Sequence, residues 1–260
     1  GFDRIDLAKA ERYNVMVANN NGSNANSVAE HVLMLIFALL RQLIFHHDSV
    51  INGPWKNLKH TNIELSGKTL GIYGLGRIGK ELAKKALALD VKIQYFDMLR
   101  QFDLEKELDL KYVFPEELLK NSDIVSYHVP KTTFTHKIIN QTSLKMMRSN
   151  SLLINASRGD VQDENAIYQA LVSGQIFAAG LDVFEVEPLP QNSPLRDLKN
   201  VVLTPHSAPD RECYVRAVNH ALENLLKVSK GEVPQSLVVN YEKETHKFLE
   251  LFPDVKFFTS

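Results

Sequence analysis

The feature that most constrains the fold is a glycine-rich turn that joins a strand pattern to a helix pattern. Residues 69–73 form a compact apolar run, which is typical of a buried parallel strand. The turn Gly74-Leu75-Gly76-Arg77-Ile78-Gly79 follows at once, and residues 78–89 then carry apolar side chains at helical spacing. This order indicates a strand, turn and helix of the kind from which open parallel sheets are built.

The same rhythm continues over much of the chain. We predict further strands at residues 91–96, 124–128, 151–155, 178–183 and 201–204. Helical patterns lie between them, notably at 115–120 and 163–173. Because strands that alternate with helices form a parallel sheet covered on both faces, the sequence predicts an α/β fold with a doubly wound parallel sheet.

Other elements flank this region. Residues 4–18 predict a short helix and then a strand at 14–18, and residues 27–47 predict one long helix that ends before Gly53-Pro54-Trp55. A last helix is predicted at 211–230, with Gly231 as its C-terminal cap. The longest apolar run, 32–40, is far shorter than the roughly 20 residues of a membrane helix, so we expect a buried or dimer-forming helix there.

Composition narrows the class of protein. A net charge of −1 over 260 residues gives no electrostatic case for binding nucleic acid or an anionic membrane. The single cysteine, Cys213, excludes an intrachain disulfide and fits a reducing compartment. No signal peptide is visible at the start, no metal site is expected, and a cytoplasmic protein is the prediction.

The glycine turn and a later carboxylate predict a dinucleotide site. The first glycine allows the tight turn, the second lets a pyrophosphate approach the backbone, and the third lets helix and strand pack closely. Asp97 closes the next predicted strand, 18 residues after Gly79. A carboxylate there accepts hydrogen bonds from ribose hydroxyls and repels a 2′-phosphate, which favours NAD over NADP, although the nearby Arg100 weakens that preference.

Three ionisable residues, Arg158, Glu187 and His206, each follow a different predicted strand. Ligands of open α/β sheets bind where the strands end. A guanidinium binds a carboxylate with two parallel hydrogen bonds, and an imidazole can carry a proton near neutral pH. Singly, each residue could be a surface or structural group; together they indicate a dehydrogenase acting on a small hydroxy acid.

The sequence resembles the D-isomer-specific 2-hydroxyacid dehydrogenases from residue 1 to about residue 240. The matching segments are residues 1–6, 27–30, 53–55, the glycine turn with Asp97, residues 128–130, 155–164, 181–188 and 204–206, and Glu223-Asn224. The resemblance implies a Rossmann-type NAD-binding domain at 23–208 and the remnant of a smaller, flavodoxin-like substrate domain at 1–22. It further implies a helix that returns to that domain at 209–240 and a tail at 241–260.

The resemblance also implies roles for individual residues. Arg158 would bind the substrate carboxylate, His206 would be the general acid and base, and Glu187 would hold the imidazole. Asp182 would contact the nicotinamide carboxamide. The remaining cofactor contacts would come from Gly74, Gly76, Arg77, Ile78, Gly79, Asp97, His128, Val129, Pro130, Ala156, Ser157, Arg158 and His206. A homodimer built on the helix at 27–47 is implied as well.

Some features depart from the family pattern. Members carry a substantial N-terminal segment that precedes residue 1, so we expect a fragment or a shortened gene. Residues 207–211 differ from the usual small, Gly- and Thr-containing segment, and residues 241–260 run past the usual end. Glyoxylate, hydroxypyruvate, phosphoglycerate and lactate types of substrate all stay open.

Three alternatives stay open too. The turn at 22–31 is similar to formate dehydrogenases, but those enzymes pair the histidine with glutamine, so Glu187 argues against formate. A non-catalytic NAD-sensing scaffold, similar to the corepressors of this superfamily, could retain all three ionisable residues. An inactive remnant would bind NADH without oxidising it.

Overall fold

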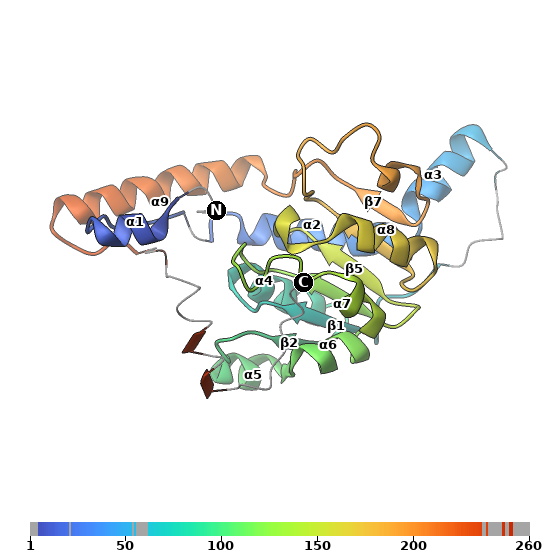
Figure 1. Ribbon diagram of the computed structural model, residues 1–260, viewed down its shortest axis with the longest axis horizontal. Helices are drawn as coiled ribbons and strands as arrows, with labels where there is room; N and C mark the ends of the chain where they lie inside the picture. Colours follow the sequence, from blue (N-terminus) through green and yellow to red (C-terminus); the bar gives the residue numbers. More distant parts are fainter. Residues whose placement is uncertain are drawn as a thin grey trace.

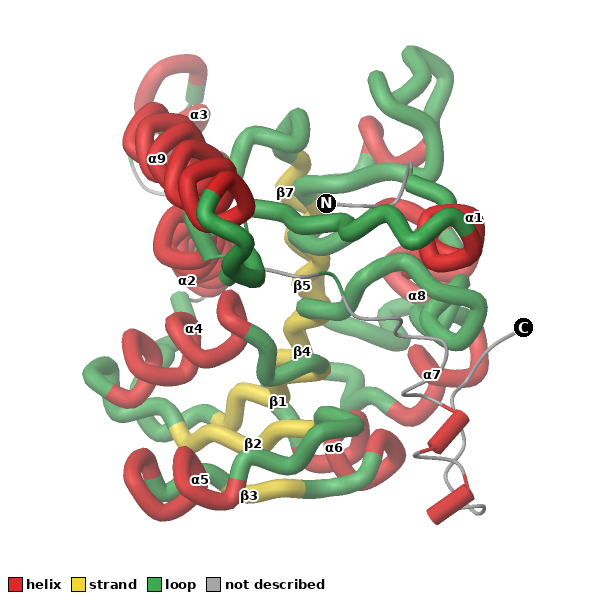
Figure 2. The backbone as a smooth tube through the Cα atoms, turned by 90° about the vertical axis from the view of Figure 1, so that its left-hand side faces the viewer, coloured by secondary structure: helices red, strands yellow, loops and turns green. Residues whose placement is uncertain are grey.

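A seven-stranded parallel sheet forms the centre of the molecule (Figures 1 and 2). The computed structural model describes residues 5–20, 22–53, 55, 62–235, 238, 246–247 and 250–251. The strand order is β3-β2-β1-β4-β5-β6-β7, and every neighbouring pair is parallel. The strands are β1 (Thr69–Tyr73), β2 (Lys92–Phe96), β3 (Lys111–Tyr112), β4 (Ile124–Tyr127), β5 (Leu152–Asn155), β6 (Ala178–Leu181) and β7 (Val201–Leu203).

Helices cover both faces of the sheet, on opposite sides of the strands in Figure 2. One layer contains α2 (Ala25–Leu40) and α4 (Arg77–Leu87), and the other contains α6 (Pro115–Asn121), α7 (Gln141–Met146) and α8 (Glu164–Val172). Successive strand residues point to opposite faces, so Leu152 and Ile154 pack in the first layer and Leu153 in the second. Both faces are therefore buried, which explains why most strand residues are apolar and confirms the predicted doubly wound sheet.

The strand order reverses direction between β1 and β4. The chain winds outward from β1 through β2 to β3, then returns to place β4 on the other side of β1. Strands that diverge in this way leave a crevice at their carboxyl ends, which is where ligands of open α/β sheets bind. The glycine turn leaves β1 at this edge of the sheet.

The long helix predicted at 27–47 is wrong. Two helices occupy this region, α2 and α3 (Leu43–Asn52), and they are bent by 57° relative to each other. Gln42, at the junction, has a left-handed backbone with φ of 47°, and the carbonyl of Leu40 accepts a hydrogen bond from the N–H of Ile63. The bend ends the contact of this segment with the sheet: α2 buries ten residues, whereas α3 buries none. The predicted break at Gly53 is confirmed, and Pro54 lies outside the described residues.

The strand predicted at 14–18 is also wrong, because that segment contains only one β-bridge position, at Ala18. A strand needs a row of hydrogen bonds to a neighbouring strand, whereas here Val17 accepts a hydrogen bond from Val238 N–H and Val15 N–H donates back to the Ala10 carbonyl of the preceding helix. The short helix before it is α1 (Leu7–Arg12). Helix α5 (Phe102–Leu108), helix α7 and strand β3 were not predicted.

Helix α9 (Arg211–Ser229) extends away from the sheet (Figure 1) and ends as predicted, with Gly231 in the left-handed region. It buries only Cys213, and α1 buries no residue. Two 3₁₀ helices, η1 (Gly159–Val161) and η2 (Pro194–Asp197), complete the described elements. Among the described residues, no helix by itself has the length and apolar composition to cross a membrane; α2 and α3 pass that test only as a bent pair.

Candidate active site

The turn after β1 has the geometry that its glycines predicted. Gly74 has φ of +100°, and a Cβ atom there would lie 2.8 Å from the His128 carbonyl oxygen. A Cβ atom on Gly79 would overlap the Gly74 carbonyl, so this glycine lets α4 start directly against the turn. Gly76 has open space where its Cβ would be. The N-terminus of α4 is thus exposed to an approaching anion.

A cavity lies over the ends of β1, β2 and β4. Of the predicted cofactor residues, Gly74, Gly76, Arg77, Asp97, His128, Val129 and Pro130 line it. Ile78 instead packs against the apolar core and Gly79 against the turn. The sequence did not single out the other lining residues, which are Tyr73, Leu75, Lys80, Phe96, Met98, Leu99, Gln101, Thr132, Phe134 and Thr135.

Asp97 faces this cavity with its carboxylate held by the backbone. One oxygen accepts a hydrogen bond from Leu75 N–H at 2.7 Å and the other from Leu99 N–H at 3.0 Å. Burial raises the pKa of Asp97, while these backbone hydrogen bonds and the charge of Lys80 oppose the rise. Each oxygen keeps capacity for a further donor such as a ribose hydroxyl.

Two residues that line the cavity, Tyr73 and His128, each carry a buried polar atom. The Tyr73 hydroxyl and His128 Nδ1 are buried and have no hydrogen-bond partner among the described residues. The other ring nitrogen of His128 contacts Ser126 Oγ at 2.9 Å, and burial lowers the pKa of His128 to about 4, so the ring is neutral near pH 7. Buried polar groups are normally paired, so these two atoms are suited to a polar ligand. The residues present therefore fit a dinucleotide.

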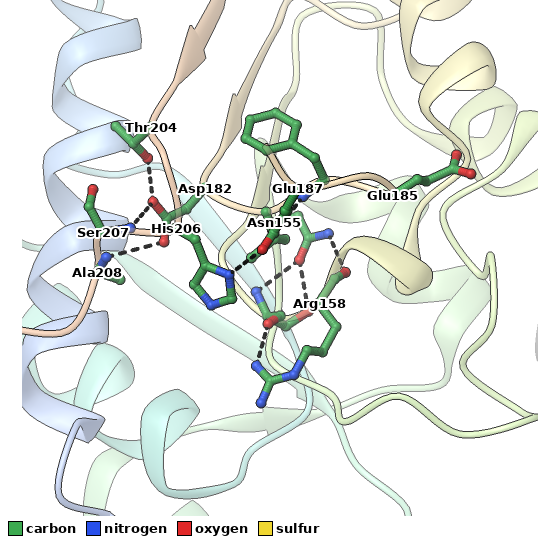
Figure 3. Close-up of polar contacts among 12 residues, drawn as sticks. Asn155, Arg158, Asp182, Glu185, Glu187, Thr204, His206, Ser207 and Ala208 are labelled. Carbon is green, nitrogen blue, oxygen red and sulfur yellow. Dashed lines mark hydrogen bonds and ion pairs between the residues drawn. The ribbon is translucent and has the colours of Figure 1, made fainter. Parts of the chain in front are cut away.

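His206 and Glu187 form a direct pair beyond β7 and β6 (Figure 3). His206 Nδ1 lies 2.8 Å from Glu187 Oε2, and Glu187 Oε1 accepts a hydrogen bond from Phe184 N–H at 3.0 Å. His206 has φ of 52°, a conformation that is held by hydrogen bonds from its N–H to the carbonyls of Asp182 and Thr204. The pair stays partly open to solvent, with 44% of the His206 side chain exposed.

Arg158 follows β5 and is positioned by a buried amide network. Asn155 Nδ2 donates to the Arg158 carbonyl at 3.1 Å and to Gln162 Oε1 at 2.8 Å. Gln162 Nε2 in turn donates to the Val183 carbonyl at 2.9 Å, which ties the Arg158 loop to the segment that carries Glu187. Ala156 and Ser157 are buried within this loop. The three predicted catalytic residues thus come to one edge of the sheet.

Gly159 decides how closely these two loops approach. A Cβ atom on Gly159 would overlap the carbonyl group of Phe184. Phe184 is also the residue whose N–H holds Glu187. Glycine is therefore required here for the Arg158 loop and the Glu187 loop to lie against each other.

Asp182 is fully buried at the end of β6, and its side chain holds the segment that contains His206. One oxygen accepts hydrogen bonds from Thr204 Oγ1 at 2.6 Å and from Ser207 N–H at 2.9 Å, and it lies 3.2 Å from His31 Nε2. The other oxygen accepts from Ala208 N–H at 3.2 Å (Figure 3). Burial raises the pKa of Asp182, but the hydrogen bonds together outweigh it, so the pKa lies below its ordinary value.

Two residues of this region were missed by sequence reasoning. His31 lies on α2, 151 residues before Asp182, and nothing local marks it as a partner of that carboxylate. Gln162 lies in the segment 155–164, but its link to Val183 depends on the contact between two loops. Within the described residues, no group of three or more His, Cys, Asp or Glu side chains could hold a metal ion.

The fold and the site together define a Rossmann-type dinucleotide-binding protein. A family model for the D-isomer specific 2-hydroxyacid dehydrogenase, NAD binding domain, matches residues 33–208. A glyoxylate reductase of Korarchaeum cryptofilum is 41% identical over 243 residues, which cover 92% of this chain and 73% of that protein. A hydroxypyruvate reductase of Thermotoga maritima is 40% identical over 230 residues, covering 87% of this chain and 74% of that protein.

A solved structure agrees with these relatives. The D-lactate dehydrogenase of Aquifex aeolicus, complexed with NAD and lactic acid, superposes with a TM-score of 0.83 at 32% identity over 92% of this chain and 78% of that one. The chain belongs to the D-isomer-specific 2-hydroxyacid dehydrogenase family, a family of NAD-dependent oxidoreductases. Its cofactor is NAD.

Proposed function

We propose that this protein reduces a small 2-keto acid to the D-2-hydroxy acid, and catalyses the reverse oxidation, with glyoxylate or hydroxypyruvate as the first substrates to test. The pair of His206 and Glu187, 2.8 Å apart at the carboxyl edge of the sheet, carries the proposal. The names of the relatives, glyoxylate reductase and hydroxypyruvate reductase, support the choice of substrates.

The roles follow from the chemistry of each group. When bound, NADH supplies the hydride that reaches the substrate's C2 atom, and negative charge then develops on the carbonyl oxygen. Arg158 holds the substrate carboxylate and stabilises the developing charge. His206 donates a proton to the carbonyl oxygen on reduction and accepts it back on oxidation. Glu187 is a positioning residue, since it fixes the imidazole through Nδ1 and leaves Nε2 for the substrate.

The adenosine and pyrophosphate part of the cofactor is proposed to bind in the cavity over β1, β2 and β4. The backbone amides at the start of α4 bind the pyrophosphate, and Asp97 accepts hydrogen bonds from the adenosine ribose. Asp182 is proposed to contribute at the nicotinamide end, and its hydrogen bonds to residues 204–208 make it a positioning residue for His206 as well.

The first test is NADH oxidation, followed by its absorbance, with glyoxylate, hydroxypyruvate and pyruvate in parallel. We expect turnover with at least one of them, and we expect Arg158→Ala or His206→Ala to abolish it while NADH affinity stays within about threefold of wild type, because neither residue lines the proposed ribose site. Arg148→Ala is the matched control, because Arg148 binds Asp123 and Lys120 just before β4, at the amino ends of the strands. Full turnover by Arg158→Ala would contradict the proposed carboxylate site.

We also propose a homodimer through α2 and α3. Both helices expose large apolar side chains, namely Met34, Phe37, Leu43, Ile44, Val50 and Ile51. A second copy of the same surface would bury them around a twofold axis. Light scattering is expected to give a dimer for wild type and for Val172→Glu, an exposed apolar position on α8, and a monomer for Ile44→Glu. A monomeric wild type at micromolar concentration would overturn this proposal.

Finally, we propose that the protein works in a reducing compartment such as the cytoplasm. Cys213 is a free, buried cysteine at the start of α9. Proteins of reducing compartments keep their cysteines as free thiols. Microscopy of a fluorescently tagged full-length protein tests the location directly.

A further inference from the structure

The loop after Asp97 contains an arginine that is turned away from the cofactor cavity. Leu99 and Gln101 line the cavity, but the guanidinium of Arg100, between them, binds Glu105 of α5. Arg100 Nε lies 2.9 Å from Glu105 Oε1, and its second nitrogen lies 2.9 Å from Oε2. Both oxygens of one carboxylate are therefore used by one guanidinium, which is the geometry of a strong pair.

Aromatic rings hold the guanidinium in this position. Its central carbon lies 4.7 Å from the ring centre of Phe102 and 4.9 Å from that of Tyr112. A cation over aromatic faces gains further attraction. Arg100 is thus bound on several sides by α5 and β3, the two elements next to the loop.

Glu105 is itself held by a tyrosine of the core. The buried Tyr95 donates its hydroxyl proton to Glu105 Oε1 at 2.6 Å, and Gln101 N–H donates to the Tyr95 oxygen at 2.9 Å. The Glu105 side chain is only 14% exposed. The hydrogen bond from Arg100 lowers the pKa of Glu105, and the same bond raises that of Arg100, so the pair stays charged at neutral pH.

The position of Arg100 bears on which dinucleotide the cavity accepts. NADP differs from NAD by a phosphate on the adenosine ribose, and arginine is the side chain that best binds such a dianion. Arg100 is three residues from Asp97, the carboxylate proposed to face that ribose. Two other cations, Arg77 and Lys80, already line the cavity, and Lys80 Nζ donates to Gln101 Oε1 at 2.7 Å.

We propose that Glu105 is a specificity-determining residue that holds Arg100 out of the cavity, so that the site favours NAD over NADP. Without Glu105, Arg100 keeps only its contacts with the rings of Phe102 and Tyr112, which are weaker than the ion pair, and it can turn toward the ribose and bind a 2′-phosphate. Glu105 acts on the cofactor only through Arg100, which makes it a positioning residue. The inference depends on the proposed placement of the adenosine ribose beside Asp97.

Equilibrium binding tests this proposal without turnover. NADH and NADPH are titrated separately into wild type, Glu105→Gln, Arg100→Gln and the double variant, and binding is followed by the fluorescence of the reduced nicotinamide. Glu117→Gln, which breaks the exposed ion pair between Lys111 of β3 and Glu117 of α6, is the matched control. Thermal unfolding of each variant reports whether it is folded.

We expect Glu105→Gln to bind NADPH about tenfold more tightly than wild type does, a change of about 1.4 kcal/mol, with little change for NADH. Arg100→Gln alone should match wild type, because Arg100 does not reach the cofactor there. The double variant should lose the NADPH gain, because the gain requires the arginine. This non-additivity is a result that a purely structural role of Glu105 would not produce.

Two outcomes would overturn the proposal in different ways. A folded Glu105→Gln variant with wild-type NADPH affinity, or a double variant that keeps the gain, would reject the role of Glu105 while leaving the cofactor site intact. A wild-type protein that binds neither nucleotide would reject the cofactor site and this inference together.

Discussion

Asp97 and Asp182 occupy equivalent places in the sheet but have opposite surroundings. Each directly follows a parallel strand, β2 for Asp97 and β6 for Asp182, at the same edge. Asp97 accepts hydrogen bonds from two backbone amides and lines a cavity. Asp182 is fully buried and accepts hydrogen bonds from Thr204, Ser207 and Ala208, with His31 close to one oxygen.

The difference comes from what lies beside each strand end. Asp97 faces the glycine turn after β1, where small residues leave open space. Asp182 faces the segment after β7, whose backbone it holds in the conformation that presents His206. The position of a carboxylate at the end of a strand therefore does not determine its role. The role depends on the neighbouring loop, which leaves Asp97 open to a ligand but uses Asp182 to hold its own backbone.

Removal of the Asp182 carboxylate should have the largest effect. Asp182→Ala leaves the half-buried Thr204 hydroxyl and two loop amides without their acceptor, which we expect to cost about 3 kcal/mol or more of the free energy of unfolding. Urea unfolding measures the loss, and turnover should fall with it because His206 is displaced. Asp97→Ala is the control and should lose much less. Equal losses of free energy of unfolding in the two variants would contradict the proposal that only Asp182 has a structural role.

Loss of the contact between His31 of α2 and Asp182 should have the second largest effect. His31 Nε2 lies 3.0 Å from Thr204 Oγ1 as well as near Asp182, and its side chain is 11% exposed. His31→Leu removes a polar partner from a buried carboxylate, so we expect a loss of about 1 to 2 kcal/mol by urea unfolding. His31→Gln, which keeps a donor, should recover part of it. A stable His31→Leu variant would mean that residues 204–208 suffice to hold Asp182.

Asp97→Ala should change cofactor preference and leave the fold largely intact. Loss of the carboxylate removes the repulsion of a 2′-phosphate, so the ratio of NADPH to NADH affinity should rise about tenfold, or about 1.4 kcal/mol. Fluorescence titration with both nucleotides measures this ratio. An unchanged ratio would show that Asp97 does not contact the ribose, and the comparison would then rest on Asp182 alone.

The pH dependence of stability should have opposite signs for the two groups, and this is the smallest effect. The pKa of Asp182 is lowered in the folded protein, so its stabilising contribution is present above about pH 3.9 and is lost as pH falls through the folded pKa. Burial raises the pKa of Asp97, so its stabilising contribution is present below about pH 3.9 and is lost as pH rises through the folded pKa.

Urea unfolding of Asp182→Asn and Asp97→Asn in the acid range tests these signs. The loss of free energy of unfolding caused by Asp182→Asn should become smaller as the pH falls. The loss caused by Asp97→Asn should become larger as the pH falls. Slopes of the same sign for the two variants would contradict the assignment of the surroundings.

The sheet could be predicted because its signals are local. The apolar runs of β1, β2 and β4 to β7, the glycine turn and the helical spacing of α4 each lie within a few consecutive residues. Strand β3 was missed because it has only two residues and exists through its pairing with β2. The break after α2 was missed because apolar spacing continues through Gln42, whereas the backbone turns there.

The sequence by itself determined the glycine turn, the carboxylate at the end of β2 and the separate ionisable residues of the reactive set. Only the tertiary structure decided that His206 contacts Glu187, that residue 159 must be glycine because it lies against the Phe184 carbonyl, and that His31 contacts Asp182. Likewise, nothing in the order of residues 97–105 indicates that Glu105 turns Arg100 away from the cavity. The physical reason is range: strands and turns depend on neighbours in sequence, whereas these contacts exist only after distant segments have packed at one edge of the sheet.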